Sequence, residues 1–290
     1  MKPIEPIPKL LSLSQPKGGT PLFTTGPGPY DFSLNEYRFQ LVTTPHQGAQ
    51  FEEVFYRDFH EILGRDHNSP EYQKIAQGSR QLDARFHEHM LRMIALNPQD
   101  EPIETICCYL DTMGILPGEI KENCNFNTLR QHCSLMELGR LAIRKDYRNT
   151  SLVSMGLILF IIRNALLHDI DLIIESAFPK NVRMFKNIGF NTFSQKISTD
   201  HLYQMEKELC YYNFATKLYS WKKDQPPAHS EGCLSNYHIR IFQLLPEDEI
   251  ANACHRLLER NRTKPGHLAS YALNYGSFNT RHQHPESSTP

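Results

Sequence analysis

The sequence predicts an α/β (α+β) domain whose central sheet contains a parallel pair of strands. Leu135–Ile143 and Ile170–Ala177 have the apolar pattern of strands and are joined by an apolar helix over Leu152–His168. A strand–helix–strand unit of this kind forms a right-handed parallel crossover. His89–Ala95 and Ile103–Asp111 form two further predicted strands, separated by an Asn-Pro-Gln-Asp turn.

Upstream of these strands, Tyr37–Val42 alternates as a strand does. Ala49–Leu63 carries apolar residues at spacings of three and four, which predicts a helix. Asp66–Gln81 is polar and is expected to be a loop.

Downstream of the crossover, a short helix is expected over Asn181–Asn187, with Pro179 near its start. Phe190–Ile197 is expected to be a strand, and Gln204–Trp221 and Pro246–Arg260 are expected to be helices.

Composition divides the chain into four parts. Residues 1–33 are rich in Pro, Gly, Ser and Thr and are expected to form a flexible arm. Residues 34–200 are the expected core, 201–269 a helical extension, and 270–290 a disordered tail. The helices of the extension are expected to cover a binding pocket, to form a protein interface, or to add packing without a direct role.

Charge and cysteine usage exclude several classes of protein. The formal net charge of -1 gives no reason to expect a nucleic-acid partner. The seven cysteines are odd in number and form no Cys-x-x-Cys pair, and no histidine pair has helical metal-ligand spacing, so no metal site is expected. No signal peptide begins the chain, and the apolar run Met155–Ile162 is too short to span a membrane, although peripheral membrane contact stays open. These features predict a cytoplasmic protein.

Glu137 is the candidate catalytic residue, because it lies on the strand that opens the crossover. A carboxylate beside a half-buried groove has a raised pKa and can take a proton from an amine. Strand alternation puts Glu137 and Gly139 on one face of the sheet and Arg140 on the other. The alternative is a surface salt bridge between Glu137 and an arginine.

The entry to the following helix is a candidate anion site. It reads Arg148-Asn149-Thr150-Ser151, so Thr150 or Ser151 can cap the helix and its free amides can hold a phosphate group, assisted by the charge of Arg148. The alternative is an ordinary cap with solvated cations.

The residues from Glu137 to Phe190 resemble the acyl-donor core of the GNAT acyltransferases. The shared pattern is Glu-x-x-Arg-Leu-Ala-Ile on a strand, a Tyr-Arg turn, a long helix, a strand, and a closing Phe-Lys-Asn-Ile-Gly-Phe. The Glu-Leu-Gly-Arg run is most similar to the branch that uses acyl-carrier protein, which holds acyl-homoserine-lactone synthases, ornithine-lipid (hemolysin-type) acyltransferases and N-acyl amino acid synthases. The resemblance covers residues 36–198 and implies a mixed, mostly antiparallel sheet with a splayed parallel pair, flanked by helices.

Two upstream segments are similar to the same branch. They are the Arg-x-Phe-x-x-x-Leu-Gly element that begins at Arg57 and the Asp-x-x-x-x-x-His element that begins at Asp83. The resemblance implies that Arg57 and Asp83 shape the acceptor and acyl pockets, together with Arg140. The arginine that often ends the second strand of this branch is absent from Thr105–Leu110.

The chain departs from acetyl-CoA-using relatives at the helix entry. Their Arg-x-x-Gly-x-Gly is replaced by Arg148-Asn149-Thr150-Ser151-Leu152-Val153, which lacks the glycines that let a backbone approach pyrophosphate. A phosphopantetheine arm on a carrier protein has no such pyrophosphate. The resemblance therefore implies an acyl-phosphopantetheine donor, on acyl-carrier protein or coenzyme A, and no permanently bound cofactor.

These features lead to two hypotheses. The first is an N-acyltransferase that moves a long-chain acyl group to the amine of an amino acid or related small molecule, with Glu137 as base. An exposed amide at the splay would then hold the thioester oxygen. The second is a catalytically idle module of the same fold that binds an acyl ligand or a protein partner. Covalent catalysis by Cys107 or Cys108 would need a histidine partner that the sequence does not place beside them.

Overall fold

The computed structural model describes residues 23–28, 30–63, 68–122, 124–148, 150–200 and 205–214, together with 245, 248, 250–253, 255–256 and 259. Its strands are β1 (Phe23–Thr25), β2 (Phe32–Leu34), β3 (Tyr37–Leu41), β4 (Met90–Leu96), β5 (Pro102–Leu110), β6 (Leu135–Ile143), β7 (Leu172–Ala177), β8 (Asn191–Asp200) and β9 (Met205–Asn213). Its α-helices are α1 (Pro45–Leu63), α2 (Pro70–Phe86), α3 (Pro117–Lys121), α4 (Asn127–Arg130), α5 (Ser151–Leu167) and α6 (Pro179–Asn187). Two 3₁₀ turns, His87–His89 and Lys145–Tyr147, precede β4 and α5.

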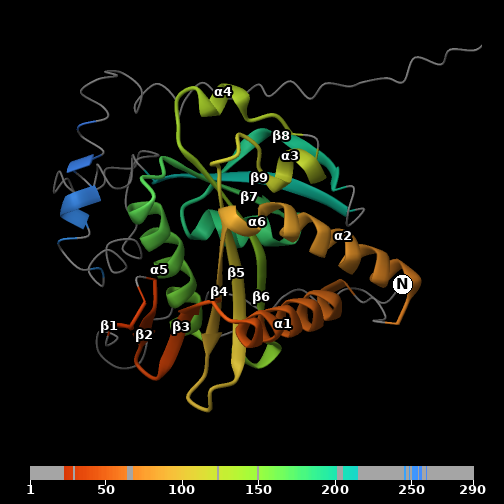
Figure 1. The fold of residues 1–290 in the computed structure, drawn as a ribbon. Helices are drawn as coiled ribbons and strands as arrows, with labels where there is room; N and C mark the ends of the chain where they lie inside the picture. The colour runs from red at the N-terminus through yellow and green to blue at the C-terminus, as the bar shows by residue number, and fades with distance from the viewer. Residues whose placement is uncertain are drawn as a thin grey trace, which may run out of the picture.

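The strands of the described chain form one mixed sheet in the order β1-β2-β3-β4-β5-β6-β7-β9-β8 (Figure 1). Every neighbouring pair is antiparallel except β6 and β7, which are parallel and joined through α5. The expected fold class, a mostly antiparallel sheet with a splayed parallel pair and flanking helices, is confirmed.

Two apolar cores cover the two faces of the sheet. One contains side chains of α5 and α6 together with Met136 and Leu138 of β6. The other contains side chains of α1 and α2 together with Leu135 and Ala142 of the same strand. The two faces of β6 are therefore buried under different pairs of helices, and we call them the α5/α6 face and the α1/α2 face.

The loop expected over Asp66–Gln81 is wrong, because α2 occupies most of it. Ser69 caps this helix by accepting a hydrogen bond from the backbone N–H of Tyr72, and a proline follows at the first helical position. Its buried residues lie at helical spacing and pack on the sheet; they are Tyr72, Ile75, Ala76, Ser79, Leu82 and Phe86.

The helix expected over Gln204–Trp221 is wrong in its first half, because β9 occupies Met205–Asn213. This strand pairs with β7 on one side and β8 on the other, so sheet pairing overrides the helical spacing of its apolar residues. The described residues between 248 and 259 are helical, as expected. The expected tail, residues 270–290, lies outside the described residues.

Within the described residues, no helix is both long and apolar enough to cross a bilayer.

Candidate functional site

The parallel strands β6 and β7 separate partway along their length. They pair from Leu135–Leu172 to Leu138–Glu175, after which β6 continues to Ile143 without pairing to β7. An unpaired strand edge presents backbone N–H and C=O groups. The expected splay is therefore present, and it leaves hydrogen-bonding groups of β6 available to a ligand.

A pocket occupies this splay and is lined from both faces of the sheet. We call it the passage; it encloses about 930 Å³ of space and is open to solvent. Phe55 and Leu82 line it from the α1/α2 face, and Met184 and Phe185 line it from the α5/α6 face. Side chains from both layers of helices therefore meet at the splay.

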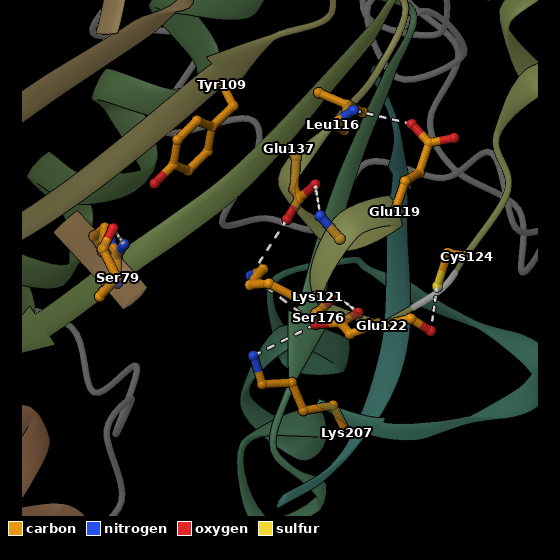
Figure 2. A network of polar contacts seen from close by, with 12 residues as sticks. Ser79, Tyr109, Leu116, Glu119, Lys121, Glu122, Cys124, Glu137, Ser176 and Lys207 are labelled. Carbon is orange, nitrogen blue, oxygen red and sulfur yellow. Dashed lines mark hydrogen bonds and ion pairs between the residues drawn. The ribbon is translucent and has the colours of Figure 1, made fainter. Parts of the chain in front are cut away.

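Glu137 lies at the vertex of the splay and is 1% exposed. Its Oε2 accepts a hydrogen bond of 2.8 Å from the backbone N–H of Gly118, and its Oε1 lies 3.7 Å from Nζ of Lys121 (Figure 2). A Cβ at position 118 would lie 3.2 Å from Oε2, so glycine allows this close approach. The surface salt bridge considered above is wrong, because the carboxyl group is buried.

Burial sets the protonation of Glu137. Desolvation raises its pKa to about 7 against the opposing effects of Lys121 and the Gly118 amide, and the nearby Glu122 raises it further. Oε1 has no hydrogen-bond partner within the described residues. A carboxyl group with this pKa exchanges a proton at neutral pH, which is what a general base requires.

A second buried carboxylate supports the same region. Glu122 accepts a hydrogen bond of 2.5 Å from the hydroxyl of Ser176 on β7 and one of 3.5 Å from Nζ of Lys207 on β9. Lys121 lies between Glu122 and Glu137, at 4.0 Å from the former (Figure 2). These side chains connect α3, β6, β7 and β9 by polar contacts around the passage.

Arg140 does not lie where simple alternation places it. The strand pairing advances two residues on β5, from Cys107 to Thr105, but three on β6, from Gly139 to Ala142, so β6 contains a bulge. Arg140 has a positive φ of 56° at this bulge. The extra residue turns its side chain to the α1/α2 face, the same face as Glu137, and the expectation of opposite faces is wrong.

Asp83 and Arg140 are brought together at the passage. Nη2 and Nε of Arg140 donate hydrogen bonds of 2.8 and 3.2 Å to Oδ1 of Asp83, which also accepts one of 3.0 Å from the hydroxyl of Tyr109. The guanidinium lies over the ring of Phe55, with 5.0 Å from Cζ to the ring centroid. Arg140 and Tyr109 line the passage, so this network forms its wall on the α1/α2 face.

Arg57 is not brought to the passage. It lies on α1 with a side chain 40% exposed and pairs with Glu53 one helical turn away, at 3.2 Å. It is absent from the lining of the passage, and its expected role in substrate binding stays a prediction.

Arg148 lines the passage at the start of α5. Its Nε donates a hydrogen bond of 2.9 Å to the carbonyl oxygen of Ile143, while its Nη2 is buried and has no partner within the described residues. Thr150 occupies the N-cap position but makes no capping hydrogen bond with its side chain. Ser151 begins the helix, and Asn149 lies outside the described residues. Arg148 thus places a cationic donor at the passage, three residues before the N-terminus of α5.

An apolar pocket adjoins the passage on the α5/α6 face. It holds about 400 Å³ of space, and its lining is Ile106, Leu138, Leu141, Ser154, Leu157, Ile158, Ile161, Glu175, Met184, Phe185 and Ile188. Glu175 also lines the passage, so it lies at the junction of the two spaces.

Four of these charged residues were not singled out in the sequence: Lys121, Glu122, Glu175 and Lys207. Glu175 carried a usable signal, since it is the one charged residue inside the apolar strand 172–177. The two lysines carried none, because each reaches the site only through the packing of α3 or β9 onto the sheet.

The cysteines on β5 are poor nucleophiles. Cys107 and Cys108 are fully buried, and burial raises the pKa of both thiols above the usual value. A thiolate is therefore strongly disfavoured at either position.

No protein-family model matches the chain, and no curated protein is similar enough in sequence to count as a match. Among solved structures, the chain is similar to FeeM, an N-acyl amino acid synthase from uncultured soil microbes, with 14% identity, a TM-score of 0.49, and coverage of 61% of this chain and 90% of that chain. It is also similar to a putative N-acetyltransferase from Lactobacillus plantarum, with 13% identity, a TM-score of 0.43, and coverage of 62% and 99%. A ribosomal-protein-S5-alanine acetyltransferase from Vibrio fischeri has 13% identity, a TM-score of 0.42, and coverage of 63% and 96%. At these identities and TM-scores, the similarities give no information about the activity of this chain.

Proposed function

We propose that this chain is an N-acyltransferase that moves a long-chain acyl group from acyl-carrier protein, or from acyl-CoA, to the amine of an amino acid or related small molecule. The observation that carries the proposal is the passage at the β6–β7 splay, which is lined from both faces of the sheet and has the buried carboxyl group of Glu137 beside it, 3.7 Å from the passage-lining Lys121.

The donor would approach from the α5/α6 face. The unpartnered Nη2 of Arg148 and the amides at the start of α5 suit the phosphate of a phosphopantetheine arm. The adjoining apolar pocket suits an acyl chain, because burying methylene groups there is favourable. Amides on the free edge of β6 would stabilise the negative charge that develops on the thioester oxygen.

The acceptor would approach from the α1/α2 face, where Arg140 lines the passage and is held in place by Asp83. Its amine attacks the thioester carbon while Glu137, directly or through one water molecule, accepts the amine proton. Holding both substrates in one passage supplies a further part of the rate enhancement.

The first test is incubation of the purified protein with acyl-carrier proteins that carry saturated chains of different length and with a pool of amino acids. Native mass spectrometry detects donor binding, and product analysis detects an N-acyl amino acid. We expect a product whose rate of formation falls about a hundredfold or more in Glu137→Gln, since a positioned base contributes at least that much.

Donor binding without any product would contradict the enzymatic role and favour the idle binding module. Neither binding nor product with carrier-protein or coenzyme A donors would overturn the proposal. Glu53→Gln is the matched control, because Glu53 is an exposed carboxylate on α1 and should leave the rate unchanged.

A further inference from the structure

Glu175 is a buried carboxyl group that the mechanism above does not use. It forms the last register pair of β6 and β7, with Leu138, so it lies where the strands begin to separate. It lines both the passage and the apolar pocket. The residue is only 9% exposed, and its Oε2 has no hydrogen-bond partner within the described residues.

Charged groups from several elements face Glu175. Lys121 of α3 and Lys207 of β9 are the cations, and Glu122 and Glu137 are the other carboxyl groups. The thiols of Cys108 on β5 and Cys210 on β9 also interact with it.

Burial favours the protonated form of the Glu175 carboxyl group. Burial raises its pKa well above the ordinary value; Lys207 and Lys121 oppose the shift, and Glu137 and Glu122 add to it. A protonated carboxyl group is a hydrogen-bond donor, and its proton is available for transfer.

Glu175 and Glu137 serve opposite sides of the sheet. Side chains alternate between the two faces along a strand. On β7, Glu175 therefore lies on the same α5/α6 face as Ile173 and Ala177. On β6, Glu137 lies on the same α1/α2 face as Leu135. The α5/α6 face also carries α5, at whose start Arg148 lies. A thiol that leaves toward the donor side therefore passes Glu175.

We propose that Glu175 is the general acid that protonates the departing thiol, an inference that rests on the proposed function. The amine nitrogen forms a bond to the thioester carbon and gives one proton to Glu137. The carbon–sulfur bond then breaks, and its electron pair goes to sulfur, which takes the proton of Glu175. The products are an amide and a free thiol, and return of one proton from Glu137 to Glu175 through solvent restores the site.

Tyr109 is the competing candidate for this acid. It lines the passage, but its hydroxyl donates to Oδ1 of Asp83, and its ring belongs to the α1/α2 face. Burial also raises the pKa of Tyr109 well above its usual value. Its proton is therefore held on the acceptor side of the sheet.

The test compares two donors with the acyl chain that the wild type accepts. One is the acyl-pantetheine thioester, whose alkyl thiol leaves poorly without a proton, and the other is the acyl thiophenyl ester, whose aryl thiolate leaves readily. In Glu175→Gln we expect kcat to fall about a hundredfold with acyl-pantetheine and less than about threefold with the thiophenyl ester. Glu137→Gln should lower kcat with both donors, because the amine proton must still be removed.

Glu104→Gln is the matched control, since Glu104 is a fully buried carboxyl group on β5 that also lacks partners within the described residues but lines neither pocket. It should change neither kcat. Equal losses in Glu175→Gln with both donors would show a structural or binding role and overturn the inference.

A second measurement needs no variant. In the wild type, a general acid makes kcat nearly independent of the pKa of the leaving thiol across a series of substituted thioesters, whereas a steep decrease with rising thiol pKa would contradict the inference. A wild type that transfers no acyl group from any donor refutes the proposed function itself, and this result is distinct from either outcome above.

Discussion

The buried carboxyl group of Glu137 links protein stability to pH. Its pKa of about 7 in the folded protein lies above the ordinary value of 4.5 for a solvated glutamate. Below pH 4.5 the group is protonated in both the folded and the unfolded state, so it carries no ionisation penalty. Between pH 4.5 and about 7 the unfolded chain ionises while the folded protein keeps the proton, so the folded protein loses stability as the pH rises. Above this window the group is ionised in both states and the loss stops.

Glu137→Gln removes this titration and should make the protein relatively more stable at high pH. We expect the free energy of unfolding of the variant, relative to wild type, to increase by about 2 kcal/mol between pH 5 and pH 8. Urea unfolding at a series of pH values measures this difference. For the control Glu53→Gln, at an exposed position, the free energy of unfolding should change with pH as it does in the wild type. Parallel curves for Glu137→Gln as well would contradict the raised pKa.

The sequence predicted individual site residues where local pattern determines their position. Glu137 lies on a strand, and Arg148 precedes a helix, that strong periodicity defines. Arg148 lines the passage, and Glu137 lies beside it, with Oε1 3.7 Å from the passage-lining Lys121. The side-chain direction of Arg140 could not be predicted, because one inserted residue in β6 reverses the alternation. Lys207 could not be found either, since it reaches Glu122 across 85 positions of sequence.

At the scale of elements, the predictions agree with the structure where a segment contains a long run of apolar residues. β6 has the expected bounds, and α5 begins one residue earlier than expected, because both are buried on every side and carry long apolar runs. The segment before β4 is polar enough to predict a loop. It forms α2 because its few apolar residues lie on one face of the helix, and that face packs on the sheet. The sequence predicts a helix where β9 forms. Burial on both faces of a strand removes the alternation of apolar and polar residues by which a strand is identified in a sequence.

The packing of α5 on the sheet depends on Gly156. A Cβ built at this position would lie 1.9 Å from Cζ of Phe39, a ring that is fully buried and stacked on Phe32 at 4.8 Å between centroids. We expect Gly156→Ala to destabilise the protein by about 2 kcal/mol, because overpacking outweighs the gain in helix propensity. Chemical denaturation measures the change.

Gly48 in α1 provides the matched control, since a Cβ there would meet nothing within 4 Å. Gly48→Ala should stabilise the protein by about 0.5 kcal/mol through the lower entropy of the unfolded chain. If Gly156→Ala proved neutral or stabilising, the contact between α5 and β3 would be looser than the structure shows.

At the scale of the whole molecule, the lining of the passage bears on the order of events in the proposed acyl transfer. This lining comes from both faces of one sheet, which suits the simultaneous binding of the proposed donor and acceptor. The buried cysteines on β5 have raised pKa values and are not suited to carry the acyl group in an intermediate step. The structure therefore favours direct transfer within a ternary complex over transfer through an acylated protein.

Direct transfer has a kinetic signature. Initial rates measured while both substrates vary should give double-reciprocal lines that intersect, and the protein incubated with acyl-carrier protein alone should gain no covalent mass. Replacing both cysteines, as Cys107→Ala and Cys108→Ala, serves as the control and should preserve the intersecting pattern while lowering stability through the loss of buried side-chain volume. Parallel lines together with an acyl adduct on the protein would require a nucleophile in the passage, and Glu137 would then have to activate that group rather than the amine.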